Sequence, residues 1–204
     1  MNEFDIKAKD WDKNNIHMER AIAIADQMRR RIPLKPGMKV MDFGAGTALL
    51  SFLLRDEFAS VTLIDNSKEM INICNEKIAE TKSTHFDALQ INLETEDFSD
   101  QFDLVYSQMA FHHLKDIEKL LLKLHGLLND QGILAVADLY TEDGSFHGEG
   151  FTGFKGFDPE WLASEMRRAG FGEVTIQQCH VQKKAETDGS FKEYPVFLMI
   201  AKKG

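Results

Sequence analysis

Short apolar runs alternate with helical repeats along most of the chain, and this alternation restricts the fold more than any other feature. Apolar runs at 40–43, 61–64 and 133–137 are separated by stretches whose apolar residues recur every three or four positions. The run at 133–137 is continuous, as is typical of a strand covered on both faces. The alternation therefore predicts an α/β protein, a doubly wound, mostly parallel sheet with helices on both of its faces.

The boundaries of the elements follow from turn and cap residues. Asp116 and Asp158 are N-cap residues, and Gly132 and Gly170 are expected to end the helices that these caps begin. The predicted helices cover residues 16–32, 48–58, 67–82, 117–131 and 159–169. The predicted strands cover 40–43, 61–65, 85–92, 102–107, 133–138, 174–181 and 194–201. We expect one domain over residues 1–204, with an N-terminal helical cap at 1–33.

Composition and charge narrow the class of protein. The chain has 204 residues, with 24 Lys and Arg against 33 Asp and Glu, which gives a net charge of −9. An acidic protein repels nucleic acid and anionic membranes, so neither is an expected partner. Cys74 and Cys179 form no metal-binding or disulfide pattern, and no apolar run is long enough for a membrane helix or a signal peptide. These features predict a cytoplasmic protein.

A glycine-rich turn at residues 42–48 (DFGAGTA) lies between the first strand and the next helix. Such a turn lets a ligand approach the backbone, and it places N–H groups at the start of a helix. A dinucleotide-binding GxGxxG loop needs glycine at position 49, which is Leu49 here. A GxGxG loop departs only at Ala48. A turn that merely packs a strand against a helix is the alternative without a ligand.

Asp65 ends the second strand, 21 residues after Gly44. A carboxylate at this end of the strand beside a glycine loop can accept hydrogen bonds from both hydroxyls of a ribose. By itself, an Asp in this position is more often a helix cap. Together with the glycine loop, it favours a nucleoside-containing ligand.

Five motifs in a fixed order resemble the class I S-adenosylmethionine-dependent methyltransferases, in their small-molecule branch. They are residues 40–47 (VMDFGAGT), 65–70 (DNSKEM), 102–114 (FDLVYSQMAFHHL), 127–134 (LLNDQGIL) and 169–171 (AGF). In the fourth motif, Asn129, Asp130 and Gln131 replace the lysine, proline and glycine that are usual in this family. The resemblance implies a Rossmann-like, seven-stranded sheet whose last strand is antiparallel.

The resemblance also implies bound S-adenosylmethionine, with S-adenosylhomocysteine as its product. The backbone of the glycine loop, together with Asp42, Ser107 and Gln108, would then lie near the methionine part, and Asp65 near the ribose. Trp11 would cover the cofactor, whose sulfonium is a suitable neighbour for an aromatic ring. A helix anchor is the alternative role for Trp11. The full expected set is Trp11, Asp42, Gly44, Ala45, Gly46, Asp65, Asn66, Met70, Asn92, Leu93, Ser107 and Gln108, of which Asn66, Met70, Asn92 and Leu93 would contact adenine.

Histidines lie at the positions where the resemblance places the methyl acceptor. His112 and His113 follow the fourth strand, and one of them is a candidate base for an acceptor that is protonated at neutral pH. A structural turn is the alternative role for this pair. The glycine-rich segment 143–157 is a candidate lid or substrate loop and contributes His147. Asp138 and Tyr140 are weaker candidates.

Two missing patterns restrict the acceptor. The Asn/Asp-Pro-Pro-Tyr motif that holds amide or nucleobase nitrogens is replaced by SQMA at 107–110, so we do not expect methylation of nucleobase amines or glutamine amides. The carboxylate set of metal-dependent catechol methyltransferases is also lacking, so we expect no metal. The leading hypothesis is methyl transfer to a small molecule by a monomer or weak homodimer. A methyltransferase-like cofactor-binding protein without catalysis and an NAD-dependent oxidoreductase are the alternatives.

Overall fold

A single seven-stranded sheet organises the structure, which is a computed structural model describing residues 5–6, 8–185 and 189–204. The strand order is β3-β2-β1-β4-β5-β7-β6, and only β7 runs antiparallel to its neighbours. This confirms the predicted fold class. The strands are β1 (Lys39–Phe43), β2 (Ser60–Asp65), β3 (Phe86–Gln90), β4 (Phe102–Gln108), β5 (Leu128–Leu139), β6 (Phe171–Ala185) and β7 (Phe191–Lys203).

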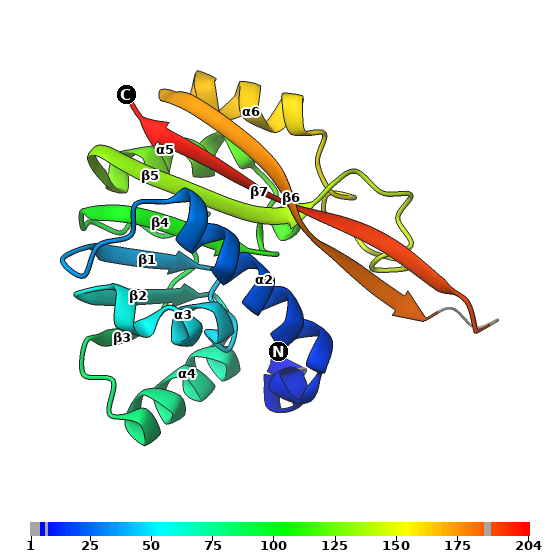
Figure 1. The fold of residues 1–204 in the computed structure, drawn as a ribbon, viewed down its shortest axis with the longest axis horizontal. Helices are drawn as coiled ribbons and strands as arrows, with labels where there is room; N and C mark the ends of the chain where they lie inside the picture. The colour runs from blue at the N-terminus through cyan, green and yellow to red at the C-terminus, as the bar shows by residue number, and fades with distance from the viewer. Residues whose placement is uncertain (1–4, 7, 186–188) are drawn as a thin grey trace.

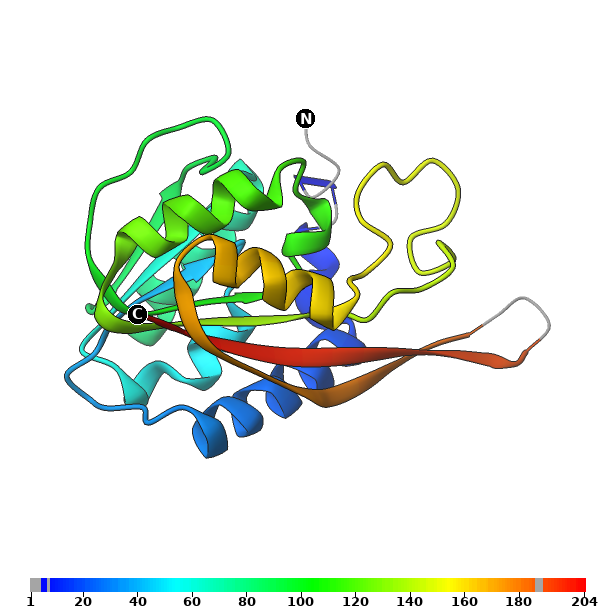
Figure 2. The same ribbon diagram turned by 90° about the horizontal axis from the view of Figure 1, so that it is seen from above.

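Helices cover both faces of the sheet (Figures 1 and 2). One face packs against α5 and α6 around Leu121, Leu124 and Met166, and the other packs against α2, α3 and α4 around Ile24, Leu50 and Cys74. The helices are α2 (Asn15–Arg31), α3 (Leu49–Leu53), α4 (Lys68–Thr81), α5 (Ile117–Leu127) and α6 (Pro159–Arg168). Among the helices in the described ranges, none has the length and apolar character that are needed to cross a bilayer.

The caps behave as the sequence predicts. Asp116 accepts a hydrogen bond from Lys119 N, and Asp158 accepts one from Trp161 N with Pro159 in the first turn. Ser67 caps α4 in the same way, through Met70 N. Each side chain satisfies an N–H group that the helix itself leaves unpaired.

Two predicted helix boundaries were wrong. The helix expected over 48–58 is α-helical only as far as Leu53, and a separate 3₁₀ turn, η2 (Arg55–Glu57), follows it. Helix α5 ends at Leu127, because Leu128 already has extended backbone, so Gly132 lies inside β5 rather than at the helix end. The turn before the main part of β5 instead uses Gln131, whose φ is 62°.

Strands β6 and β7 are longer than predicted and form a hairpin that extends beyond the body of the sheet (Figure 2). Their pairing continues from Phe171 opposite Lys203 out to Ala185 opposite Phe191. The outer pairs lack a cover of helices, and their hydrophobic pattern is weak, which is why the sequence underestimates their length. The hairpin passes beside the segment 143–157.

The N-terminal part docks on the glycine loop. The 3₁₀ helix η1 (Ala8–Lys13) carries Asp12, which accepts a hydrogen bond from Thr47 Oγ1 at 2.6 Å and forms an ion pair with Lys77 at 2.5 Å. Lys77 Nζ also donates to the backbone oxygen of Thr47 at 2.6 Å. The cap is therefore attached to the loop and to α4 together. Residues 1–4 and 7 of the expected cap lie outside the described residues.

Candidate functional site

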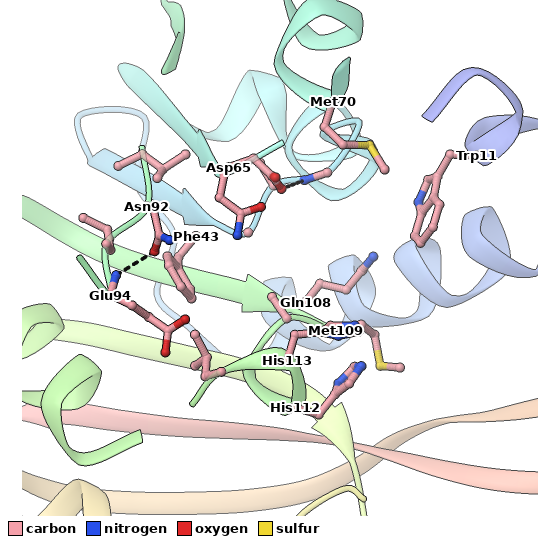
Figure 3. A pocket seen from close by; sticks show the side chains of 18 of the residues that line it. Trp11, Phe43, Asp65, Met70, Asn92, Glu94, Gln108, Met109, His112 and His113 are labelled. Carbon is pink, nitrogen blue, oxygen red and sulfur yellow. Dashed lines mark hydrogen bonds between the residues drawn. The ribbon is translucent and has the colours of Figure 1, made fainter. Parts of the chain in front are cut away.

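A cavity lies at the carboxyl ends of β1, β2 and β4, where ligands bind in open parallel sheets (Figure 3). Counted with its open mouth, it encloses about 1160 Å³. Asp65 and Met70 lie on one side, and His112 and His113 lie on the other (Figure 3). Two chemically different ends therefore share one cavity.

The glycine loop forms one wall of the cavity, and its two glycines, Gly44 and Gly46, have different roles there. Gly44 has φ of 69°, and a Cβ there would lie 2.4 Å from the Cβ of Ala110, so the loop packs closely against the segment after β4. Gly46 has φ of 55°, and a Cβ there would meet nothing within 4 Å. Gly44 is thus required by packing, whereas Gly46 leaves the cavity open beside the backbone.

Asp65 ties the loop to the end of β2. Its carboxylate accepts hydrogen bonds from Gly46 N and Ser67 N, each at 2.8 Å. Burial raises the pKa of Asp65, while these backbone donors act in the opposite direction. Asn66 N also interacts with this carboxylate. A carboxylate has about four acceptor positions, so Asp65 keeps acceptor capacity for at least one hydroxyl of a ligand.

Apolar side chains line the part of the cavity around Asp65, including Ile64, Met70, Ile91 and Leu93. Asn92 lies among them, and its Oδ1 accepts a hydrogen bond from Glu94 N at 3.0 Å (Figure 3). This bond fixes the amide of Asn92 at the cavity wall. The combination of apolar walls and a fixed polar edge suits a flat, partly polar ring.

Trp11 reaches the cavity from the N-terminal cap (Figure 3). Its ring stacks on His17 of α2, with centroids 4.2 Å apart, and its backbone oxygen contacts His17 Nδ1 at 3.0 Å. Burial lowers the pKa of His17, which favours the neutral ring. Trp11 is therefore anchored on α2 and also lines the cavity, whereas its role in covering a cofactor stays a prediction.

Gln108 supplies an acceptor at the end of β4. Its Oε1 is buried and has no hydrogen-bond partner within the described part of the chain, although the residue lines the cavity. A buried carbonyl oxygen without a partner costs about 1–3 kcal/mol. A ligand that donates a hydrogen bond at this point would remove that cost.

Asp42 and Ser107 are not among the residues that line the cavity, and their expected place near a cofactor stays a prediction. Asp42 accepts a hydrogen bond from Ser51 Oγ at 2.5 Å, and burial raises its pKa to about 7. Ser107 Oγ donates to the backbone oxygen of Phe43 at 2.8 Å. Both side chains point toward neighbouring elements because strand side chains alternate between the two faces of the sheet.

His112 forms the floor of the other end of the cavity. His112 lies in the short 3₁₀ helix η3 (Phe111–His113), and its Nδ1 lies 2.6 Å from Oδ1 of Asp138 on β5. Both side chains are buried, at 1% and 0% exposure. The carboxylate accepts the Nδ1 proton, so the Nε2 lone pair of His112 faces away from Asp138.

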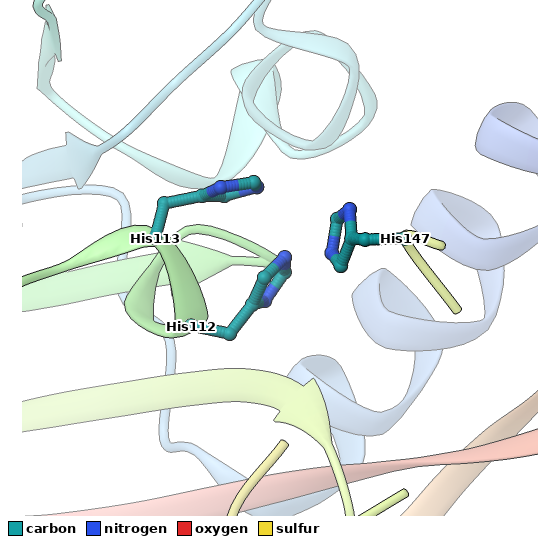
Figure 4. Close-up of side chains that lie close together, drawn as sticks. All are labelled: His112, His113 and His147. Atoms are coloured by element: carbon teal, nitrogen blue, oxygen red, sulfur yellow. The ribbon is translucent and has the colours of Figure 1, made fainter. Parts of the chain in front are cut away.

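His113 and His147 complete a group of three imidazoles (Figure 4). One nitrogen of each ring, together with one of His112, lies within 4.8 Å of the others. Phe151 stacks on His147 with centroids 3.9 Å apart and presents its edge to His113 at 5.3 Å. The sequence predicted these three histidines as separate candidates, and the structure brings them together.

The segment 143–157 is attached to the site at several points. Phe154 N donates to the backbone oxygen of His112 at 2.7 Å, and a Cβ on Gly153 would lie 2.2 Å from that oxygen. On the other side, Lys184 Nζ of the hairpin donates to Phe146 O at 2.5 Å. The segment therefore lies against the histidine end of the cavity, and its role as a lid or substrate loop stays a prediction.

Sequence reasoning missed several lining residues, above all Arg20 of α2. Arg20 is 4% exposed and donates from Nη1 to Gln182 Oε1 of β6 at 3.0 Å. Its Nε has no hydrogen-bond partner among the residues that the structure describes. Burial lowers the pKa of Arg20 to about 10, so the guanidinium is still charged at neutral pH. An Arg amid Ala21, Ile24 and Ala25 on the buried stripe of α2 was the available signal.

The fold is an open α/β sheet with a cavity at the ends of β1, β2 and β4, the place where folds of this type bind their ligands. A family model described as a methyltransferase domain matches residues 34–150. The chain belongs to this family, the class I S-adenosylmethionine-dependent methyltransferases.

Sequence relatives agree with this assignment. An uncharacterised methyltransferase of Schizosaccharomyces pombe is 31% identical over 159 residues, which cover 70% of this chain and 56% of the relative. The chain spans about half the length of curated relatives that it matches.

Solved structures agree in fold. A complex of the Haloferax volcanii Trm112 methyltransferase activator with a methyltransferase has a TM-score of 0.79 at 20% identity, covering 99% of this chain and 98% of the matched chain. A Haemonchus contortus phosphoethanolamine N-methyltransferase bound to phosphomonomethylethanolamine and S-adenosylhomocysteine has a TM-score of 0.73 at 15% identity, covering 91% and 52%.

Proposed function

We propose that this chain transfers a methyl group from S-adenosylmethionine to a small-molecule acceptor. The observation that carries the proposal is the single cavity that joins the glycine loop and Asp65 to three convergent imidazoles. The first end suits a nucleoside cofactor, and the second end offers polar groups to a second molecule. Methyl transfer needs these two ligands side by side.

The residues present fit the cofactor at both of its ends. Asp65 would accept hydrogen bonds from the ribose hydroxyls, and the apolar wall with Asn66, Met70, Asn92 and Leu93 would hold the adenine. The unpartnered Oε1 of Gln108 would accept a hydrogen bond from the methionine ammonium group. Gly44, Ala45 and Gly46 would lie along the methionine chain, and Trp11 would cover it.

When bound, the cofactor supplies a methyl carbon on a cationic sulfur, which leaves as a neutral thioether when an acceptor atom bonds to that carbon. The chain's own residues hold the acceptor in line with the methyl group and exclude water. The segment 143–157 closes the acceptor end through Phe146 and His147. Orientation and exclusion of water are the main contributions that this site can make.

The acceptor is expected to contact the imidazoles and the buried Arg20. A hydroxyl or thiol acceptor must lose its proton before or during transfer, and an imidazole held by a carboxylate is a suitable base near neutral pH. His112 with Asp138 has this arrangement, while His113 and His147 lie within reach. Arg20 favours an acceptor that also carries an anionic group, because a buried guanidinium binds a carboxylate or phosphate well.

Calorimetry with the purified full chain tests the cofactor. S-adenosylhomocysteine is expected to bind with a dissociation constant in the micromolar range or below, whereas NAD gives no heat, because Leu49 replaces the glycine of the dinucleotide loop. Gly46→Val, which fills the cavity beside the loop, should abolish binding. Gly189→Val, at a position with φ of 84° where a Cβ also meets nothing within 4 Å, is the matched control, because Gly189 does not line the cavity. Heat from NAD alone would overturn the proposal.

An acceptor panel tests the reaction. Incubation with methyl-labelled S-adenosylmethionine and hydroxyl, thiol and amine acceptors, each with and without an anionic group, should label one class of small molecule. Tight binding of S-adenosylhomocysteine without any labelled product over the panel would favour the alternative, a cofactor-binding protein without catalysis. The expected monomer or weak homodimer and the cytoplasmic location stay predictions.

A further inference from the structure

Three imidazoles converge at the end of the cavity that lies away from Asp65 (Figure 4). His112 and His113 come from η3, whereas His147 comes from the segment 143–157, far along the chain. One nitrogen from each ring lies within 4.8 Å of the other two. Two chain segments have therefore been brought together at one point, and each supplies a good metal ligand.

The hydrogen bonds of His112 leave its Nε2 available to coordinate a metal ion. Its Nδ1 is bound to Asp138 at 2.6 Å, and its buried Nε2 has no hydrogen-bond partner in the ranges that the structure describes. Asp138 is itself held by Leu139 N at 2.7 Å and by His112 N at 3.2 Å. Metal-binding histidines commonly donate their other ring nitrogen to a carboxylate in this way, which fixes the tautomer and raises the basicity of the ligand.

The donor set indicates the metal. Three neutral imidazoles with no directly placed carboxylate suit zinc, which takes three protein ligands and an open fourth position in catalytic sites. Zn–N bonds of ~2.0–2.1 Å place tetrahedral ligands roughly 3.4 Å apart, so nitrogens that lie within 4.8 Å of one another need to approach by up to about 1.4 Å on binding. His147 lies in the segment 143–157, where it stacks on Phe151.

We propose that His112, His113 and His147 bind one zinc ion, with Asp138 as the carboxylate that orients His112, and with the fourth position open to the acceptor. This proposal replaces the expectation of no metal, which considered cysteine and carboxylate ligands but not the histidines. Its catalytic meaning rests on the proposed methyl transfer. Its binding claim does not depend on that function.

The ion would select and activate the acceptor. A hydroxyl or thiol bound at the fourth position is deprotonated more easily, because the metal stabilises the anion. The acceptor R–XH becomes metal-bound R–X⁻, and its proton is released to solvent. No electron is gained or lost, and no imidazole is required as base. The acceptor class is therefore a small hydroxyl or thiol compound rather than an amine.

Zinc binding is measured on the full chain after dialysis against chelator, with Zn²⁺ alone as the probe and a chromophoric competitor as the reporter. One ion per chain is expected, with a dissociation constant below ~1 µM. His113→Gln and His147→Gln should each weaken zinc binding at least ~100-fold, since even outer partners of a metal site contribute 10–100-fold. His85→Gln is the matched control, because His85 lies outside the cluster at the start of β3.

Substitution with Co²⁺ tests the geometry. Cobalt in a four-coordinate site with three imidazoles gives intense visible absorption, whereas six-coordinate cobalt gives weak bands. The intense spectrum is expected in the wild-type chain and in His85→Gln, and it should be lost in His147→Gln. Thermal unfolding and S-adenosylhomocysteine binding show whether each variant is folded. His147 and His113 are more informative than His112, whose buried ring has a structural role as well.

The outcomes separate this proposal from the proposed function. Zinc affinity that is unchanged in both folded variants, or no binding at 100 µM Zn²⁺, overturns the metal site. Methyl transfer that persists after chelator treatment overturns its catalytic role and leaves an imidazole as the base. Loss of S-adenosylhomocysteine binding in the otherwise folded metal-free chain would instead contradict the cofactor site as we have described it.

Discussion

His112 and Asp138 form a fully buried pair, with Nδ1 of the imidazole 2.6 Å from Oδ1 of the carboxylate. The two residues lie at the same, carboxyl end of two adjoining parallel strands, His112 just after β4 and Asp138 near the end of β5. The carboxylate accepts two further hydrogen bonds from the backbone. This network orients His112 Nε2, which is the group that would act on an acceptor or on a metal.

Asp138→Asn should reduce the rate of methyl transfer while sparing the cofactor. An amide cannot accept from all three donors, so His112 loses its fixed tautomer and orientation. We expect kcat to fall 10–100-fold, as for other residues that orient a ligand, with S-adenosylhomocysteine affinity unchanged within twofold. Asp130→Asn, an exposed change at the other end of β5, is the control. An equal loss of cofactor affinity would show that Asp138 merely supports the fold.

Asp65→Ala should weaken S-adenosylhomocysteine binding by about 1.5–3 kcal/mol, the value of charge-assisted hydrogen bonds. It should also lower the melting temperature, since Asp65 holds Gly46 N and Ser67 N. Calorimetry and thermal unfolding measure the two effects. Asp87→Ala, an exposed change on neighbouring β3, should alter neither. Unchanged affinity would remove Asp65 from the cofactor site.

Asp42 predicts a pH-dependent stability. Burial raises its pKa from 3.8 to about 7, so the folded state holds a proton that the unfolded chain releases near pH 4. The stability that this proton supplies is present below pH 4 and is lost as the pH rises through 7. The Asp42→Asn variant carries an amide that does not titrate, so its stability does not fall in this way as the pH rises. The free energy of unfolding of the variant relative to wild type should increase by about 2 kcal/mol from pH 5 to pH 8.

Urea unfolding of both proteins at several pH values measures this difference. Asp56→Asn, which changes an exposed carboxylate on η2, should give a difference that does not depend on pH. A constant difference for Asp42→Asn as well would mean that the folded carboxylate titrates near its ordinary value.

Gln131→Gly should stabilise the chain. Gln131 is exposed and has φ of 62°, a conformation that costs an L-residue about 1–2 kcal/mol and costs glycine nothing. The greater entropy of glycine in the unfolded chain offsets about half of that gain. We expect the free energy of unfolding to rise by about 0.5–1 kcal/mol. Asp130→Gly is the control, because Asp130 is the neighbouring residue and its φ is not positive. This change should lower the free energy of unfolding, and a similar fall for Gln131→Gly would show that the positive φ of Gln131 is not strained.

The sequence was informative where local chemistry decides the structure. The Asp116 and Asp158 caps, the apolar stripe of α5 and the glycine loop before α3 depend on residues a few positions apart. Their patterns therefore predicted the order of elements and the sheet. The helix end at Leu127 and the length of β6 and β7 were missed, because those boundaries depend on pairing with distant strands.

The amino-acid sequence by itself determined the fold class, the family resemblance and most of the residues that line the cofactor end. Only the tertiary structure decided which side chains reach the cavity. It left Asp42 out of the cavity lining, brought Arg20 to its surface, and joined His147 to His112 and His113. The physical reason is distance along the chain. Contacts between remote segments depend on how the sheet, the hairpin and the segment 143–157 pack together, and no local pattern encodes that packing.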